Sequence, residues 1–105
     1  MTASDFRRLA LALPQVVEGS HHGHADFRVG KRIFATLGLE PEGYGVLILR
    51  PEEQATLTKE APTVFSPVPN GWGRQGATRV LLKKVTPTRL KRALQVAWNG
   101  KTMNR

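Results

Sequence analysis

The chain has 105 residues, of which 40% are hydrophobic and 23% charged, a composition typical of one small globular domain over residues 1–105. It contains no cysteine, which excludes disulfides and thiolate metal sites. The formal net charge is +8, and no apolar run is long enough for a signal peptide or a membrane helix, so we expect a soluble, basic, cytoplasmic protein.

The N-terminal segment predicts a helix. Apolar residues recur at helical spacing between Phe6 and Leu13, and Ser4 precedes them as the expected N-cap. Pro14 then ends the helix, because proline cannot donate the backbone hydrogen bond that the next turn needs.

Residues 16–49 predict a β-meander. The expected strands are Val16–His22, Asp26–Val29, Arg32–Leu37 and Tyr44–Leu49. Gly30 and Lys31 form a two-residue loop with glycine first, which predicts a type II′ hairpin. That hairpin would place the ring of Phe27 directly opposite the ring of Phe34.

The second half predicts two more helices and further strands. The expected elements are a helix at Pro51–Glu60, an edge strand at Val64–Val68, a glycine-rich loop at Asn70–Gly76, a strand at Ala77–Val85, and a helix that begins at Thr86-Pro87 and ends at Gly100. A helix, a run of strands and a closing helix favour an α+β fold. We expect an antiparallel sheet of about five strands with the N-terminal and C-terminal helices packed on one face.

The strongest hint of a metal site is the run His21-His22-Gly23-His24. Adjacent strand residues point to opposite faces, so only His22 and His24 could share an ion, with Asp26 as the nearby oxygen ligand. Two ligands do not make a site, and we predict no metal and no cofactor. The run is interpreted as polar packing in a turn, and a metal or catalytic site around the histidines is kept as a further hypothesis.

No pattern indicates catalysis. Ser20 and Ser66 lack the glycine pattern of a nucleophile elbow, and the paired glutamates fall in a turn and at a helix start, where acids are ordinary. We therefore expect no enzymatic activity, no catalytic residue and no small-molecule substrate.

The glycine-rich run Gly71–Gly76 differs from known phosphate-binding loops, because it lacks the lysine and hydroxyl that end a Walker motif. Closely spaced glycines let the backbone approach another group. Trp72 is interpreted first as the core residue that needs this room. The alternative is that its ring and Arg74 form a pair that stacks on a base and contacts a phosphate.

Charge is distributed unevenly along the chain. All eight acidic residues lie in residues 1–60, which have a net charge of −1, whereas residues 61–105 have nine basic residues and no acid. This asymmetry predicts a polyanionic partner for the C-terminal half, and a solubilising basic surface is the alternative. Several cations surround the expected start of the last helix, where free N–H groups favour anions: Lys83, Lys84, Arg89, Lys91 and Arg92.

Three stretches, together with the leading segment Asp5–Ala10, resemble the MmcQ/YjbR family of small bacterial proteins: Glu18–His24 with Asp26–Val29, Ile33–Gly38, and Pro67–Val68–Pro69 running through Gly71-Trp72-Gly73 to Gly76–Thr78. The resemblance implies a frataxin-like (CyaY-like) α+β fold and DNA binding through two wing-like hairpins. It would make the wings the Gly30-Lys31 hairpin, which bears Arg28, Lys31 and Arg32, and the Trp72–Gly76 loop, which bears Arg74.

We therefore predict a nucleic-acid-binding module, with DNA as the expected ligand. The expected contact residues are Arg28, Lys31, Arg32, Trp72, Arg74, Arg79, Lys83, Lys84, Arg89, Lys91 and Arg92. The alternative is a small interaction module that binds an acidic protein. The prediction depends on these cations gathering on one continuous face when the chain folds.

Overall fold

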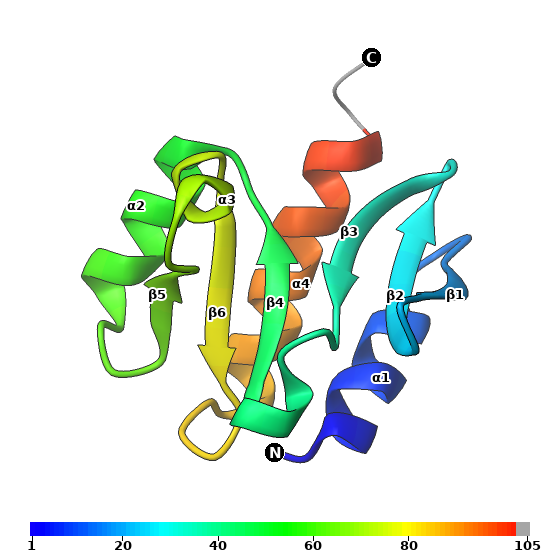
Figure 1. Ribbon diagram of the computed structural model, residues 1–105, viewed down its shortest axis with the longest axis horizontal. Helices are drawn as coiled ribbons and strands as arrows, with labels where there is room; N and C mark the ends of the chain where they lie inside the picture. Colours follow the sequence, from blue (N-terminus) through cyan, green and yellow to red (C-terminus); the bar gives the residue numbers. More distant parts are fainter. Residues whose placement is uncertain (103–105) are drawn as a thin grey trace.

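A computed structural model describes residues 1–102 as an antiparallel sheet with helices packed on one face (Figure 1). The helices are α1 (Ala3–Leu11), the one-turn 3₁₀ helix η1 (Glu40–Glu42), α2 (Pro51–Glu60), α3 (Gly71–Arg74) and α4 (Pro87–Thr102). The strands are β1 (Val17–His21), β2 (His24–Val29), β3 (Arg32–Thr36), β4 (Tyr44–Ile48), β5 (Phe65–Pro67) and β6 (Ala77–Leu81).

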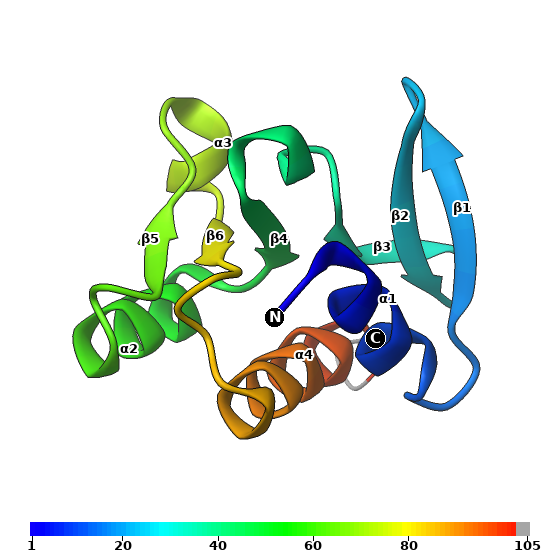
Figure 2. The ribbon, with the colours of Figure 1, turned by 90° about the horizontal axis from the view of Figure 1, so that it is seen from below.

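The sheet has six strands in the order β1-β2-β3-β4-β6-β5, and every neighbouring pair is antiparallel. The predicted α+β class is confirmed, with one strand more than expected. β5 lies at an edge, as its prolines predicted. Figure 2 shows α1, α2 and α4 below the sheet, which leaves the other face without a long helix.

The main core lies between the sheet and these helices. It contains four fully buried phenylalanines and the predicted apolar stripe of α4: Phe6, Phe27, Phe34, Phe65, Leu90, Ala93, Leu94 and Ala97. Trp98 extends the stripe, and its indole N–H donates to the carbonyl of Pro14 at 3.0 Å. A second, smaller apolar cluster of Val46, Val68 and Ala77 lies on the opposite side of β4 and β6.

The β2–β3 hairpin differs from the prediction in turn type and in register. Gly30 and Lys31 have φ values of 58° and 69°, and two positive φ values define a type I′ turn, not type II′. Phe27 pairs with Ala35 and Arg28 with Ile33, so Phe34 is the extra residue of a β-bulge. The expected pairing of Phe27 with Phe34 is therefore wrong.

Three predicted element ends are also wrong. Thr2, not Ser4, caps α1, because its hydroxyl accepts the N–H of Asp5 at 3.1 Å. β6 ends at Leu81, where the carbonyl accepts N–H groups of the following turn. α4 continues through Gly100, because one glycine costs only about 1 kcal/mol in a helix that packing already holds.

Candidate functional site

The face of the sheet opposite α4, here called the open face, is surrounded by projecting segments. Figure 2 shows α3, η1 and the β1–β2 turn rising beyond the strands on this side. The β2–β3 bulge determines which residues of β3 face this side. Phe34 and Ala35 are both fully buried in the main core, which leaves Ile33 and Thr36 on the open face.

A hollow of about 570 Å³ occupies this face between α3 and β1. It is lined by His21, Ile33, Thr36, Ile48 and Trp72, and we call it the Trp72 hollow. An adjoining hollow of about 210 Å³ shares His21, Thr36 and Trp72. The larger volume lies within the range of about 300–1,000 Å³ that small-molecule sites occupy.

Trp72 is not a core residue, so the first interpretation of this side chain is wrong. Its side chain is 42% exposed, and it forms one wall of the hollow. The tight packing belongs instead to Gly73, where an added Cβ would lie 1.7 Å from the carbonyl oxygen of Val68. The glycine therefore lets α3 lie against the backbone of Val68, and this placement directs the indole outward.

The expected loop at Asn70–Gly76 is the short helix α3, held by polar contacts. Asn70 caps it, because its side-chain oxygen accepts the N–H of Trp72 at 2.9 Å. The buried amide of Gln54 donates to the carbonyl oxygens of Gly73 and Ala77 at 2.9 and 3.0 Å. These bonds connect α2, α3 and β6, so the wall of the hollow is fixed in position.

A buried carboxylate lies beside the hollow. Asp26 is 1% exposed and accepts two hydrogen bonds from the guanidinium of Arg28, at 2.8 and 3.1 Å. The Nδ1 atom of His21 lies 3.7 Å from the same carboxylate. Gly19, opposite Asp26 on β1, makes room for the pair, since an added Cβ would lie 2.9 Å from Oδ1 of Asp26. Arg28, predicted as a phosphate contact, is therefore already paired.

The hydrogen bond from Arg28 holds the pKa of Asp26 below its usual value of 3.8, against a desolvation effect that would raise it. A carboxyl with a lowered folded-state pKa stabilises the fold above its unfolded pKa, and this contribution is lost as the pH falls through the folded value.

We expect Asp26→Asn to lower the free energy of unfolding by roughly 1–3 kcal/mol at neutral pH, because Arg28 loses its charged partner and one of the two oxygens that accept its N–H groups. The difference from wild type should shrink as the pH falls below about 4. The pKa of Asp5 is also lowered, but Asp5 is present in both the wild type and the variant, so its pH-dependent contribution to stability cancels in the difference. Urea unfolding at a series of pH values measures this. A difference that stayed constant with pH would refute the ionic role of Asp26.

The cations of the C-terminal half have no carboxylate partner within the described part of the chain. The ion pairs formed among residues 1–102 involve Arg7, Arg8, His21, Arg28 and Arg50, all in the first half. The cations of residues 61–102 without an ion pair are Arg74, Arg79, Lys83, Lys84, Arg89, Lys91, Arg92 and Lys101.

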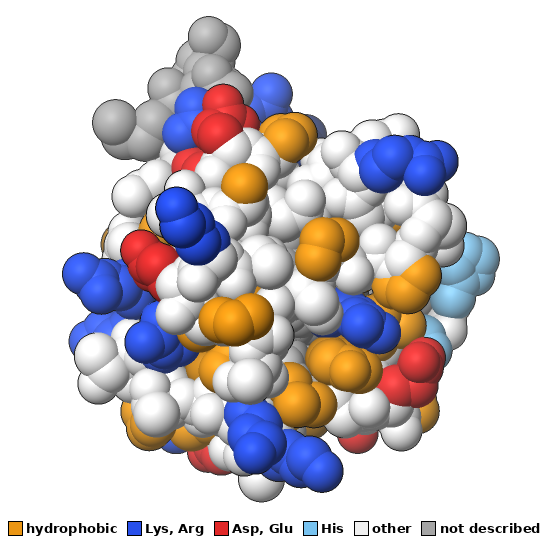
Figure 3. All heavy atoms as spheres, turned by 90° about the vertical axis from the view of Figure 1, so that its left-hand side faces the viewer, with side chains coloured by type: hydrophobic (Ala, Val, Ile, Leu, Met, Phe, Trp, Pro, Cys, Tyr) orange, Lys and Arg blue, Asp and Glu red, His pale blue; other side chains and the backbone are white. Residues whose placement is uncertain are grey.

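The predicted contact residues do not all gather in one continuous patch. In Figure 1, the β2–β3 turn with Lys31 and Arg32 and the helix α3 with Arg74 lie at the top of the sheet. The segment with Lys83 and Lys84 and the start of α4 with Arg89 lie at the bottom. Figure 3 shows Lys and Arg in separate groups on the side of α2 and β5, with hydrophobic and acidic side chains between them.

Three of these cations lie along the path of β6, and we call them the β6 cations: Arg74, Arg79 and Lys83. Arg74 precedes the strand and Lys83 follows it. Arg79 lies on the open face between them, with its guanidinium 4.4 Å from the centre of the Tyr44 ring. In contrast, Lys91 and Arg92 are exposed on α4, whose buried stripe faces the other side of the sheet.

Comparison with known proteins assigns the family. A family model described as YjbR matches residues 11–99. The protein belongs to the YjbR family. The fold of this YjbR protein is similar to the crystal structure of a Deinococcus radiodurans protein with a DUF419 domain, with a TM-score of 0.76 and 20% identity over 99% of this chain and 82% of the other. No curated protein matches.

The histidine run of this YjbR protein forms the tip of a hairpin. His22 and Gly23 have φ values of 54° and 77°, which make a type I′ turn between β1 and β2. The interpretation of the run as a turn is confirmed. Within residues 1–102, no group of three or more His, Cys, Asp or Glu side chains could hold a metal ion. None of the helices described there is long and apolar enough to cross a membrane.

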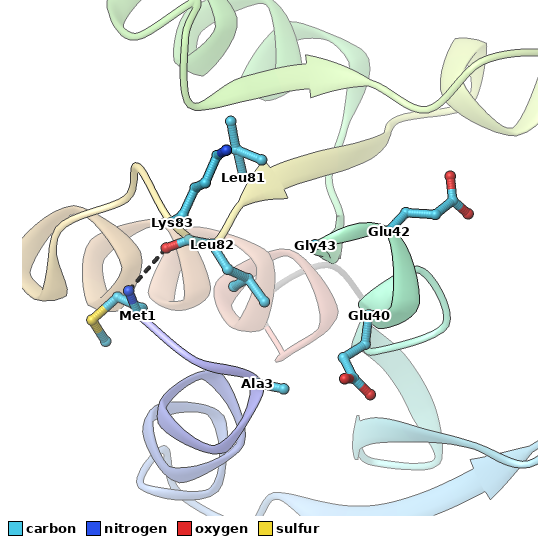
Figure 4. A pocket seen from close by; sticks show the side chains of 8 residues that line it. All are labelled: Met1, Ala3, Glu40, Glu42, Gly43, Leu81, Leu82 and Lys83. Atoms are coloured by element: carbon cyan, nitrogen blue, oxygen red, sulfur yellow. Dashed lines mark hydrogen bonds between the residues drawn. The ribbon is translucent and has the colours of Figure 1, made fainter.

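Another hollow of the YjbR domain, of about 380 Å³, lies beside Lys83 (Figure 4). Glu40 and Glu42 line it together with Met1, whose amino group donates to the carbonyl of Leu82 at 3.0 Å. Lys83 extends away from both glutamates in Figure 4. This hollow combines opposite charges, so it is a weaker anion site than the open face.

Proposed function

We propose that this YjbR-family protein binds nucleic acid, without catalysing a reaction on it, through the β6 cations and Trp72. The proposal depends on one observation: the cations of residues 61–102 form no ion pair with any carboxylate of the described chain. Lysine and arginine that contact phosphates supply most of the affinity for nucleic acid, and they do so without reading sequence.

The position of the β6 cations favours the open face over the outer surface of α4. Arg74, Arg79 and Lys83 lie before, on and after one strand, so a phosphate backbone that runs along β6 could meet all three. The exposed ring of Trp72 lies at the Arg74 end of this path. Aromatic rings combined with a cationic groove are the usual means of binding single strands.

We expect a fluorescently labelled DNA oligonucleotide to bind at low salt and to be released as salt rises, because binding displaces condensed counterions. One phosphate contact for each of the three β6 cations gives a log–log slope of about −2 for a single strand. Fluorescence anisotropy at several salt concentrations measures this slope. Absence of binding at low salt, or an affinity that does not change with salt concentration, would refute the proposal.

A matched pair of double variants tests the location. Arg74→Glu with Lys83→Glu should abolish most of the binding. Lys59→Glu with Lys91→Glu makes the same change in net charge on exposed helix surfaces and should weaken binding much less. Equal losses would refute the assignment to β6. Equally tight binding of a polyglutamate peptide would instead favour an acidic protein partner.

A further inference from the structure

The Trp72 hollow has an aromatic wall, an apolar floor and a polar edge. Trp72 is the wall and is held by the cap of Asn70, while Ile33 and Ile48 contribute the apolar side chains. An exposed indole gains free energy when a flat apolar surface covers it, because both surfaces leave water. The geometry therefore suits a planar ring system of small size.

We infer that this hollow binds one unpaired base of a single-stranded nucleic acid, stacked on the indole of Trp72. The inference rests on the proposed function and names the part of the ligand that the open face recognises. Every base presents a π-face, so stacking on Trp72 requires no particular sequence.

The polar edge of the hollow matches the edge of a base. The oxygen of Thr36 accepts the N–H of Gly38 at 3.1 Å, and its own O–H donates to no group within residues 1–102. The side chain of His21 is 55% exposed and lines the same hollow, while its Nδ1 atom lies 3.7 Å from the carboxylate of Asp26. Base edges carry both donors and acceptors, and single-stranded bases are read along these edges.

Two arginines lie on the elements that line the hollow, and we assign them to the phosphates on either side of a bound base. Arg74 follows Trp72 on the same helix, and Arg28 pairs with Ile33 across β2 and β3. The carboxylate of Asp26 lines the adjoining hollow, but its two hydrogen bonds with Arg28 compensate its charge. The remaining guanidinium N–H groups of Arg28 can still donate to a phosphate.

This arrangement distinguishes single strands from duplexes. A base within a duplex is paired and stacked, and it must be extruded before its face becomes available. We therefore expect a single-stranded oligonucleotide to bind more tightly than the duplex of the same sequence. A free mononucleotide should bind weakly, because it lacks the flanking phosphates that the cations contact.

The test combines tryptophan fluorescence with anisotropy at low salt. A single-stranded DNA oligonucleotide should quench the fluorescence of the wild type saturably. In Trp72→Phe, which keeps a ring, the remaining Trp98 should not respond, and affinity by anisotropy should be nearly retained. Trp72→Ala should weaken binding by roughly 5- to 140-fold, the usual effect of removing one stacking partner. Val17→Ala removes the other large exposed hydrophobic side chain and is the matched control, expected to bind as wild type.

The outcomes separate this inference from the proposed function. If no oligonucleotide binds at low salt, both are refuted. If salt-dependent binding occurs but Trp72→Ala binds as the wild type does, or the duplex binds as tightly without quenching, the proposed function stands and the inference is refuted. A mononucleotide or a polyglutamate peptide that quenches Trp72 at the same concentration as the oligonucleotide would also refute it, because the hollow would then recognise a small molecule or an acidic peptide.

Discussion

Gly73→Ala should lower the free energy of unfolding by roughly 3–5 kcal/mol, among the largest effects of a single substitution in this protein. The added Cβ would lie 1.7 Å from the oxygen and 2.7 Å from the carbon of the Val68 carbonyl. These are backbone atoms and cannot rotate away as a side chain can. The bond from Gln54 to the carbonyl of Gly73 would be strained by the same displacement.

Gly71→Ala is the matched control for this substitution. The added Cβ at Gly71 would have Arg74 Nη2 at 3.7 Å as its nearest neighbour, which is ordinary contact. Urea unfolding of the two variants measures the difference. If Gly73→Ala were as stable as Gly71→Ala, α3 could not be docked on Val68 as described, and the position of Trp72 would lose its physical basis.

Phe6→Ala should lower the free energy of unfolding by about 3–5 kcal/mol, because it removes a fully buried ring. The ring joins α1 to the sheet: its centroid lies 6.1 Å from that of Phe27, and its edge fills the space above Gly45. Thermal or urea unfolding of the variant measures the loss. A loss below about 1 kcal/mol would contradict this packing.

A double-mutant cycle makes the Phe6 prediction sharper. A Cβ at Gly45 would lie 2.4 Å from Cε2 of Phe6, so Gly45→Ala should destabilise the wild type. In the Phe6→Ala background the ring is absent, and the same substitution should be nearly neutral. Additive losses would show that the two residues do not touch.

The elements that the sequence predicted best depend on local signals. The bounds of α2 match the expected Pro51–Glu60, because a proline at the first helical position and acids in the first turn are signals within a few residues. The start of α4 at Thr86-Pro87 is found for the same reason. The buried stripe of that helix follows from the period of its apolar residues.

The features that escaped prediction depend on contacts between distant segments. The bulge at Phe34 is not visible in alternation alone, yet it places Ile33 and Thr36 on the open face. The glycines near Trp72 correctly indicated a close backbone approach. The partner of Gly73 is Val68, and this could not be read from the sequence.

The candidate site was predicted in part. Trp72 and Arg74 were named together as a stacking and phosphate-contacting pair, and the structure places them on one short helix beside a hollow. The pairing of Arg28 with Asp26 could be predicted from the sequence, because residues two apart on a strand share a face. The cations along β6 are separated from Lys91 and Arg92 of α4 because the strand and the helix lie in different layers, and the order of residues in the sequence does not reveal this.

Amide and indole chemical shifts, followed while a single-stranded DNA oligonucleotide is titrated into isotopically labelled protein, test the proposed interface most directly. We predict that the largest changes occur at the indole N–H of Trp72 and at Ile33, Thr36 and Arg79, and that they disappear as salt is raised. Changes confined to residues 87–92 of α4, or no changes at all, would contradict binding at the open face.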